Sequence, residues 1–161
     1  MEEPVVAEIF VSWAHRNERV KSSLLELIKP RLGIARGWVF SWWEDSDLDI
    51  GSAWDPVIKS RLEGCDYALQ LISPDFFASR YIREYEIPPF VRGDKKTLPI
   101  GLVPVPFDGT ANLVGVERLQ VFRHRNRFFS ELTSSAQREA FADALVSKIL
   151  ARLTADRTGD A

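Results

Sequence analysis

Apolar residues alternate along the chain between short, nearly continuous runs and longer runs with helical spacing. The short runs are rich in β-branched and aromatic residues, which is typical of strands. They cover residues 7–13, 37–43, 66–73 and 96–107, with a weaker fifth run at 118–122. The longer runs place an apolar residue every three or four positions, which predicts amphipathic helices. They cover residues 17–32, 52–65 and 134–153, and the first is expected to end near Pro30.

This alternation predicts the class of fold. Strands with apolar residues at nearly every position are buried on both faces, as in a parallel sheet covered by helices on each side. We therefore expect an α/β fold, a flavodoxin-like three-layer sandwich around a central, mainly parallel five-stranded sheet. The 161 residues are enough for one domain, which we place at residues 1–153. The polar residues 154–161 are expected to form a tail or linker.

In such sheets, functional groups collect at the carboxyl ends of the strands. Here those ends lead into the segments 13–17, 43–52, 73–80 and 105–116. The first three are rich in polar and aromatic residues, so the site is expected there.

Charge and composition narrow the choice of partners. The net charge of −2 gives no electrostatic reason to bind nucleic acid directly. The single cysteine, Cys65, precludes an internal disulfide and is expected to be a buried apolar residue. The sequence shows neither a signal peptide nor a membrane span, so we expect a cytoplasmic protein. No metal site is expected, because His15 and His124 are far apart in sequence and no Cys/His cluster exists.

One segment raises a chemical question. The stretch "SPDFFASRYIREYEIPPF" (73–90) begins with a capping serine and a proline at the first helical position, and it contains Glu84 and Glu86. Residues two apart on a helix point in nearly opposite directions, so these glutamates cannot form a simple carboxylate pair. On a helical wheel Glu86 shares a side with Ser79 and Arg83. The alternative is a surface helix in which Glu86 only pairs with Arg83.

The order of these segments resembles one family, the Toll/interleukin-1 receptor (TIR) domains. "EIFVSWAHRNE" resembles their opening strand and loop, and "SWWEDSDLDIGSAW" resembles their second strand and long BB loop. "SPDFFASRYIREYEIPPF" resembles the third helix of bacterial members, and "LPIGLVP" resembles the fourth strand. The similarity covers residues 7–153.

The resemblance implies two kinds of activity. Some members are adaptors that signal only by TIR–TIR association, whereas many bacterial and plant members cleave NAD+ and release nicotinamide. In the second group the catalytic residue is a third-helix glutamate followed by an aliphatic residue. This pattern matches Glu86, which precedes Ile87, better than Glu84, which precedes Tyr85. NAD+ would be a consumed substrate, and no bound cofactor is expected.

The resemblance also implies roles for other residues. Trp13 and Trp54 have aromatic rings that could stack on nicotinamide or adenine, although Trp54 equally fits packing within a helix. His15 and Arg16 could meet the phosphates, and Ser79 and Tyr81 would lie on the substrate side of the third helix. The BB-loop residues that would gate the site or join a neighbouring chain are Asp47, Leu48 and Gly51.

We therefore expect an NAD+ glycohydrolase, with ADP-ribose or a cyclic or variant form as product, that is activated by self-association with other TIR domains. By analogy with the family, the biological context would be antiviral defence, in which a sensor domain or a partner protein activates the effector. The alternative is a non-catalytic TIR interaction module. A flavodoxin-like domain that binds a phosphorylated ligand is disfavoured, because the loop after the first strand lacks the glycine, serine and threonine of a phosphate nest.

Overall fold

The structure is a computed structural model that describes residues 3–44, 60–79, 82–83, 87–88, 92 and 96–159. Its elements in chain order are β1 (Val5–Ser12), η1 (His15–Asn17), α1 (Glu18–Gly33), β2 (Trp38–Trp43), β3 (Tyr67–Ile72), α3 (Pro74–Ala78), β4 (Lys96–Gly101), η3 (Val116–Arg118), η4 (Phe129–Glu131) and α5 (Ser135–Gly159), where η marks a 3-10 helix.

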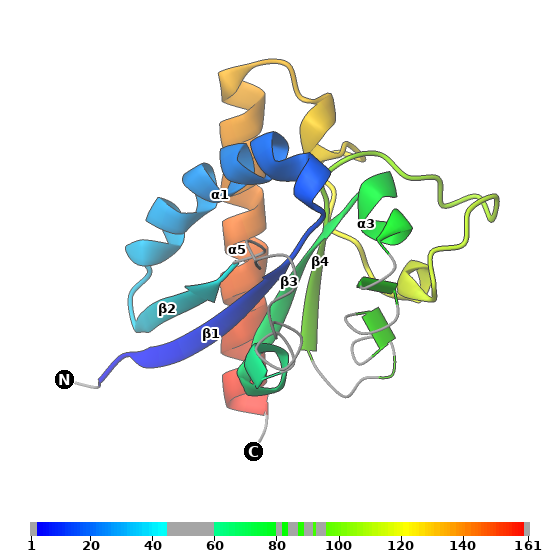
Figure 1. Ribbon diagram of the computed structural model, residues 1–161. Coiled ribbons are helices and arrows are strands. Elements are labelled where there is room, and N and C mark those ends of the chain that lie inside the picture. The colour runs from blue at the N-terminus through cyan, green and yellow to red at the C-terminus, as the bar shows by residue number, and fades with distance from the viewer. Residues whose placement is uncertain are drawn as a thin grey trace.

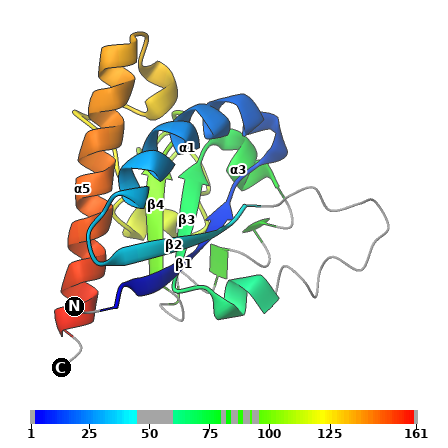
Figure 2. The ribbon, with the colours of Figure 1, turned by 90° about the vertical axis from the view of Figure 1, so that its left-hand side faces the viewer.

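The strands form a parallel sheet in the order β2-β1-β3-β4. Helices α1 and α5 pack together against one face, and α3 lies on the other side of the sheet (Figures 1 and 2). All six residues of β3 are buried, as a central strand between two helical layers requires. The predicted α/β fold with a parallel sheet is confirmed.

The predicted fifth strand is wrong for the described part of the chain, which has four strands. Residues 118–122 contribute only one bridge to the sheet, in which the Phe122 N–H donates to the Pro99 carbonyl and the Gly101 N–H donates to the Phe122 carbonyl. The ladder does not extend toward the start of β4 because Pro99 has no N–H to donate. The next carbonyl along this edge, that of Thr97, already accepts from Arg152 Nη1 at 3.2 Å.

Three helix ends differ from their predicted positions. Helix α1 runs through Pro30 to Gly33, because Leu32 is buried in the core and holds the last turn against it. Helix α3 is short and ends at Ala78, with Ser79 in an extended conformation. Residues 154–159, expected to be a tail or linker, continue helix α5 instead.

The main core lies between the sheet and the pair of helices α1 and α5. Leu24 and Ile28 of α1 and Phe141 and Leu145 of α5 pack there against the inward residues of the strands. Cys65 is buried, as predicted, and its Sγ–H donates to the Leu62 carbonyl. In the described part of the chain, no helix combines the length and the apolar character that crossing a bilayer requires.

Candidate functional site

The carboxyl ends of β1 and β3 are joined by one side chain, Asn17. Its Nδ2 donates to Asp75 Oδ2 at 3.1 Å, and its Oδ1 accepts from Ser73 Oγ at 2.6 Å. Ser73 Oγ in turn accepts from the Phe76 N–H at 2.9 Å and so caps α3. Asn17 and Ser73 are both buried, and each side-chain oxygen of the pair has a partner. This network holds the start of α3 against η1.

The carboxyl ends of β1 and β2 are joined in a different way, through Trp13 and Glu44. The indole N–H of Trp13 donates to the Glu44 carbonyl at 2.9 Å. The Glu44 carboxylate pairs with Lys21 at 3.1 Å and also with Lys29, both from α1. The start of the segment that follows β2 is therefore fixed to the first strand and to α1.

The charges around Glu44 decide its protonation. Partial burial raises the pKa of Glu44, but the hydrogen bonds and positive charges of Lys29 and Lys21 outweigh this effect. The net pKa lies below the ordinary value of 4.5, so the carboxylate stays ionised near neutral pH. Lys21 is itself buried and lies 4.0 Å from the centroid of the Trp13 ring.

Trp13, predicted to stack on a base, belongs to the core. It is 9 % exposed, and its ring contacts both Lys21 and the ring of His15, whose centroid lies 5.5 Å away at an interplanar angle of 17°. His15, whose ring stacks on Trp13, is exposed. The stacking role of Trp13 stays a prediction.

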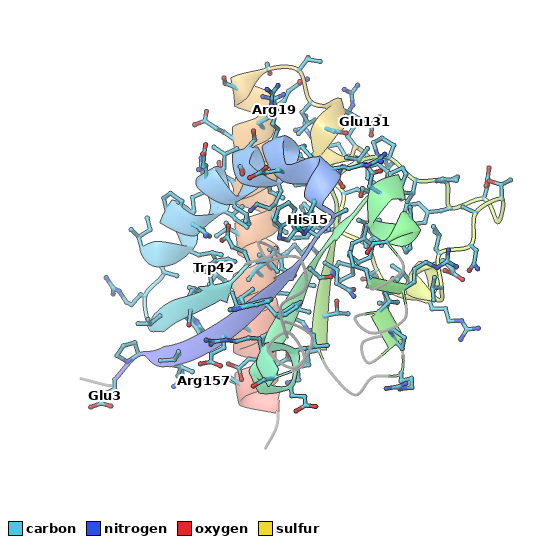
Figure 3. The ribbon with its side chains drawn as sticks, in the orientation of Figure 1. Glu3, His15, Arg19, Trp42, Glu131 and Arg157 are labelled. Atoms are coloured by element: carbon cyan, nitrogen blue, oxygen red, sulfur yellow. The ribbon has the colours of Figure 1, made fainter. Side chains whose placement is uncertain are left out.

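His15 and Arg16 form the exposed start of η1 (Figure 3 labels His15), and their contact with phosphates stays a prediction. They lie next to Asn17, so the network with Asp75 places them beside the first turn of α3. The cation of Arg16 and the stacked rings of Trp13 and His15 therefore lie at the edge where β1 and β3 end.

Ser79 has a structural position that the sequence did not predict. It ends α3, its Oγ accepts from the Ile82 N–H at 3.4 Å, and its carbonyl accepts from the Arg83 N–H at 3.0 Å. The extended Ser79 ends α3, whereas the helical wheel that related Ser79 to Glu86 assumed one helix through the whole segment. Glu86 lies outside the described residues, so this relation and the contact of Ser79 with substrate stay predictions.

Several predicted residues lie outside the described part of the chain. They are Glu86, its alternative Glu84, Tyr81, Trp54, Asp47, Leu48 and Gly51. Their roles stay predictions.

Sequence reasoning missed Asn17, Glu44, Lys21 and Asp75, which connect the strand ends. Three of these residues have a charged side chain, and a charged side chain in a loop or on a helix is usually solvated. One signal was present: Asp75 follows Pro74 at the start of a capped helix, where acidic residues are favoured and a polar partner is expected nearby.

A buried amide in β3 lies behind this edge. Gln70 is fully buried, and its Oε1 accepts from Thr97 Oγ1 at 2.7 Å. Within the described residues, Gln70 Nε2 has no hydrogen-bond partner. Strand alternation puts Gln70 on the same face as Ala68 and Ile72, which is the face that α3 covers.

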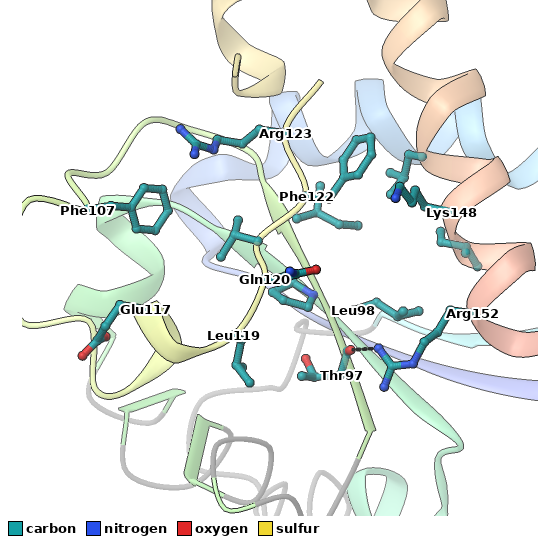
Figure 4. Close-up of a pocket in the computed structure, with 15 residues that line it drawn as sticks. Thr97, Leu98, Phe107, Glu117, Leu119, Gln120, Phe122, Arg123, Lys148 and Arg152 are labelled. Atoms are coloured by element: carbon teal, nitrogen blue, oxygen red, sulfur yellow. Dashed lines mark hydrogen bonds between the residues drawn. The ribbon is translucent and has the colours of Figure 1, made fainter. Parts of the chain in front are cut away.

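A separate cleft lies beside the outer edge of β4. It has a volume of about 630 Å³ and is lined by Leu98, Phe122 and the cationic side chains of Arg123, Lys148 and Arg152 (Figure 4). It opens between α5 and the segment 117–123, on the far side of β3 from the Asn17 network. The cleft therefore is not part of the site at the strand ends.

A parallel α/β sheet covered by helices on both faces defines a flavodoxin-like domain. A protein-family model described as "TIR domain" matches residues 9–146. The chain therefore belongs to the TIR domain family. The comparison with curated proteins found no match.

Proposed function

We propose that this TIR domain is an NAD+ glycohydrolase that cleaves the bond between nicotinamide and ribose when copies of the domain associate. The proposal rests on family membership and on the glutamate pattern in the third helical segment. Among TIR domains, both enzymes and adaptors occur, so membership alone supports either function. The setting would be the depletion of NAD+, or the production of a nucleotide signal, in antiviral defence.

The chemistry requires few groups. Nicotinamide leaves as a neutral molecule, so no acid is needed to protonate it. Positive charge develops on the ribose, as in glycoside hydrolysis. A fixed carboxylate beside the ribose stabilises that charge in the transition state. Glu86 would supply this carboxylate, and the exposed His15 and Arg16 would face the pyrophosphate.

One observation supports this site most directly: the bond from Asn17 to Asp75. It joins the loop that carries His15 and Arg16 to the first turn of the segment that leads toward Glu86. The Trp13–Glu44 contact joins the same loop to the segment that contains Asp47, Leu48 and Gly51. Three segments that the family pattern assigns to one site thus start from one edge of the sheet.

Nicotinamide release from NAD+ by the concentrated or crowded protein tests the proposal. We expect wild type to cleave NAD+, and Glu86→Gln to lower the rate by roughly 100-fold or more, because the amide carries no negative charge. Glu84→Gln is the matched control two residues away and is expected to retain most of the activity. Crowding is included because a dilute monomer can populate an inactive conformation.

The outcomes separate the alternatives. A dead Glu84→Gln beside an active Glu86→Gln would transfer the catalytic role to Glu84. Absence of cleavage by wild type under every clustering condition would favour the interaction module. The product, ADP-ribose or a cyclic form, is read from the same reaction by chromatography.

A further inference from the structure

We propose that two copies of this chain associate through the outer edges of β2, which pair antiparallel across a two-fold axis and extend the sheet from one copy into the other. This inference names an interaction surface, and it does not rest on NAD+ cleavage. The chemistry of recognition is the backbone: an unpaired strand edge offers a row of N–H and C=O groups that another strand satisfies.

Within the described residues, no strand pairs with the outer edge of β2. Among the described elements, β2 pairs only with β1 and ends the sheet. Every residue of β2 is partly or fully exposed, whereas every residue of β3 is buried. Figure 2 shows β2 in front of β1, with α1 above it.

The opposite edge of the sheet provides a contrast, because it is blocked. On β4, Pro99 has no N–H, and the Thr97 carbonyl is occupied by Arg152 (Figure 4, dashed line). Phe122 takes the remaining pairing positions at Pro99 and Gly101. Edge strands are commonly protected by proline and by charged side chains. Strand β2, "WVFSWW", has neither.

Exposed apolar side chains gather around this edge. Four large apolar side chains are exposed in the described part of the chain, and three of them are on β2 or next to it: Val39 at 47 %, its register partner Val6 at 55 %, and Ile34 at 86 %, four residues before β2. Surfaces of this kind mark interaction sites when the apolar residues cluster. The fourth, Phe107, lies beside the cleft at β4.

The absence of charge on β2 makes a second copy a compatible partner. A two-fold axis places identical strands side by side, so a charged strand would repel its own copy. No residue from Trp38 to Trp43 is charged. Two copies can therefore pair without like-charge contacts.

Geometry restricts the register of this pairing. In an antiparallel pair, two residues that lie opposite each other either both direct their N–H and C=O groups toward the partner strand or both direct them away from it. Successive residues of a strand alternate between these two directions. When the two strands are identical, the numbers of opposite residues must therefore differ by an even number. A register centred on Phe40 meets this condition and sets Trp38 opposite Trp42 of the second copy. These residues line one face of the strand, so the register forms a continuous row of aromatic cross-strand pairs. On the other face it sets Val39 opposite Ser41 of the second copy.

The Val39–Ser41 pair allows a charge test of this register. Val39→Lys combined with Ser41→Lys places lysine opposite lysine in both halves of the dimer. Val39→Lys combined with Ser41→Glu places lysine opposite glutamate instead. Both positions are exposed, so both variants are expected to fold like wild type, which circular dichroism and the unfolding midpoint check.

Sedimentation equilibrium of the full chain without NAD+ measures the result. We expect wild type to form a weak dimer, the Lys/Lys variant to dissociate roughly tenfold more readily, and the Lys/Glu variant to recover most of the affinity. A monomeric wild type at the highest soluble concentration would overturn the proposal. Equal association of wild type and the Lys/Lys variant would also overturn it, as would failure of the Lys/Glu variant to recover. Because the assay contains no substrate, loss of this dimer and loss of NAD+ cleavage are separate results.

Discussion

At the scale of single residues, the candidate site depends on side chains that connect strands. Asn17 is the clearest case, because it both donates to Asp75 and accepts from Ser73 while it is buried. A buried amide that satisfies both neighbours fixes their relative positions, and its loss would leave the buried Ser73 hydroxyl without an acceptor. The sequence shows only an asparagine before a helix, a residue type usually explained by capping, and Asn17 makes no side-chain cap.

Glu44 leads to a prediction about pH. Its folded pKa is lowered, so the stability that its ion pairs supply is present above the unfolded carboxyl pKa near 4.5 and is lost as the pH falls through the folded value. We expect Glu44→Gln to lower the urea midpoint near neutral pH, because Lys21 would stay buried without its anion.

The difference between wild type and Glu44→Gln should shrink as the pH falls below 4.5, and urea titrations over a pH series measure it. Glu26→Gln on α1 is a suitable control, since Glu26 is exposed. A difference that stayed constant down to acid pH would show that the charge of Glu44 does not contribute.

At the scale of elements, apolar periodicity predicted most of the fold. The strands β1, β2 and β3 and the helices α1 and α5 lie close to their predicted positions, because each buries a face that its spacing marks out. The predictions fail where a tertiary contact determines the local structure. Asp156 bonds Tyr67 and so continues α5 through residues that look like a polar tail, and Arg152 takes the carbonyl that a fifth strand would need. Local sequence cannot show such contacts.

The candidate site was less predictable than the fold. The edge of the sheet followed from the class of fold, and His15 and Arg16 follow β1 at that edge, but their contact with phosphates stays a prediction. The end of α3 at Ala78 did not follow, since nothing in "DFFASRYI" marks a helix end and Ser79 is able to cap a new turn instead. A serine side chain can bond backbone groups both at the end of a helix and at the start of a new turn, so its effect depends on the surrounding packing.

The end of β4 gives a second prediction at this scale. A Cβ at Gly101 would lie 2.7 Å from Phe128 Cδ2, which is inside the buried cluster around α3. Gly101→Ala should therefore displace Phe128 and destabilise the domain by about 1–3 kcal/mol. Gly33→Ala, at the end of α1, is the control, because a Cβ there meets nothing within 4 Å. Chemical denaturation compares the two, and equal stability of both variants would contradict the packing argument.

At the scale of the whole molecule, the two ends of the sheet differ in their chemistry. The carboxyl ends of β1 and β3 carry the exposed Arg16 beside the Asn17 network, whereas the amino ends of β3 and β4 are closed by α5. There, Tyr67 of β3 donates to Asp156 at 2.6 Å, and Asp156 also pairs with Lys96 of β4 and with Arg152. Because α5 closes the amino end, the sheet does not depend on the loops at its carboxyl end for closure, and the sequence of those loops can vary.

The Tyr67–Asp156 pair makes the closure by α5 measurable. Burial raises the pKa of the Tyr67 phenol, and the hydrogen bond to the Asp156 carboxylate and its negative charge raise it further. Partial burial also raises the pKa of Asp156, but the Tyr67 bond and the charges of Arg152 and Lys96 outweigh this effect and lower it overall. A phenol whose folded pKa is raised supplies stability below the unfolded tyrosine pKa of 10 and loses it as the pH rises beyond that value.

We therefore expect Asp156→Asn to bring the ionisation of Tyr67 back toward ordinary pH and to lower the unfolding midpoint of the domain. The asparagine oxygen can still accept the phenol hydrogen bond, so the change isolates the charge of the carboxylate. Near-ultraviolet absorbance during alkaline titration follows the three tyrosines, and Tyr67→Phe identifies the late one. If the titrations of wild type and Asp156→Asn coincide, the Asp156 carboxylate does not act on Tyr67, and the contact through which this turn of α5 is argued to close the sheet is contradicted.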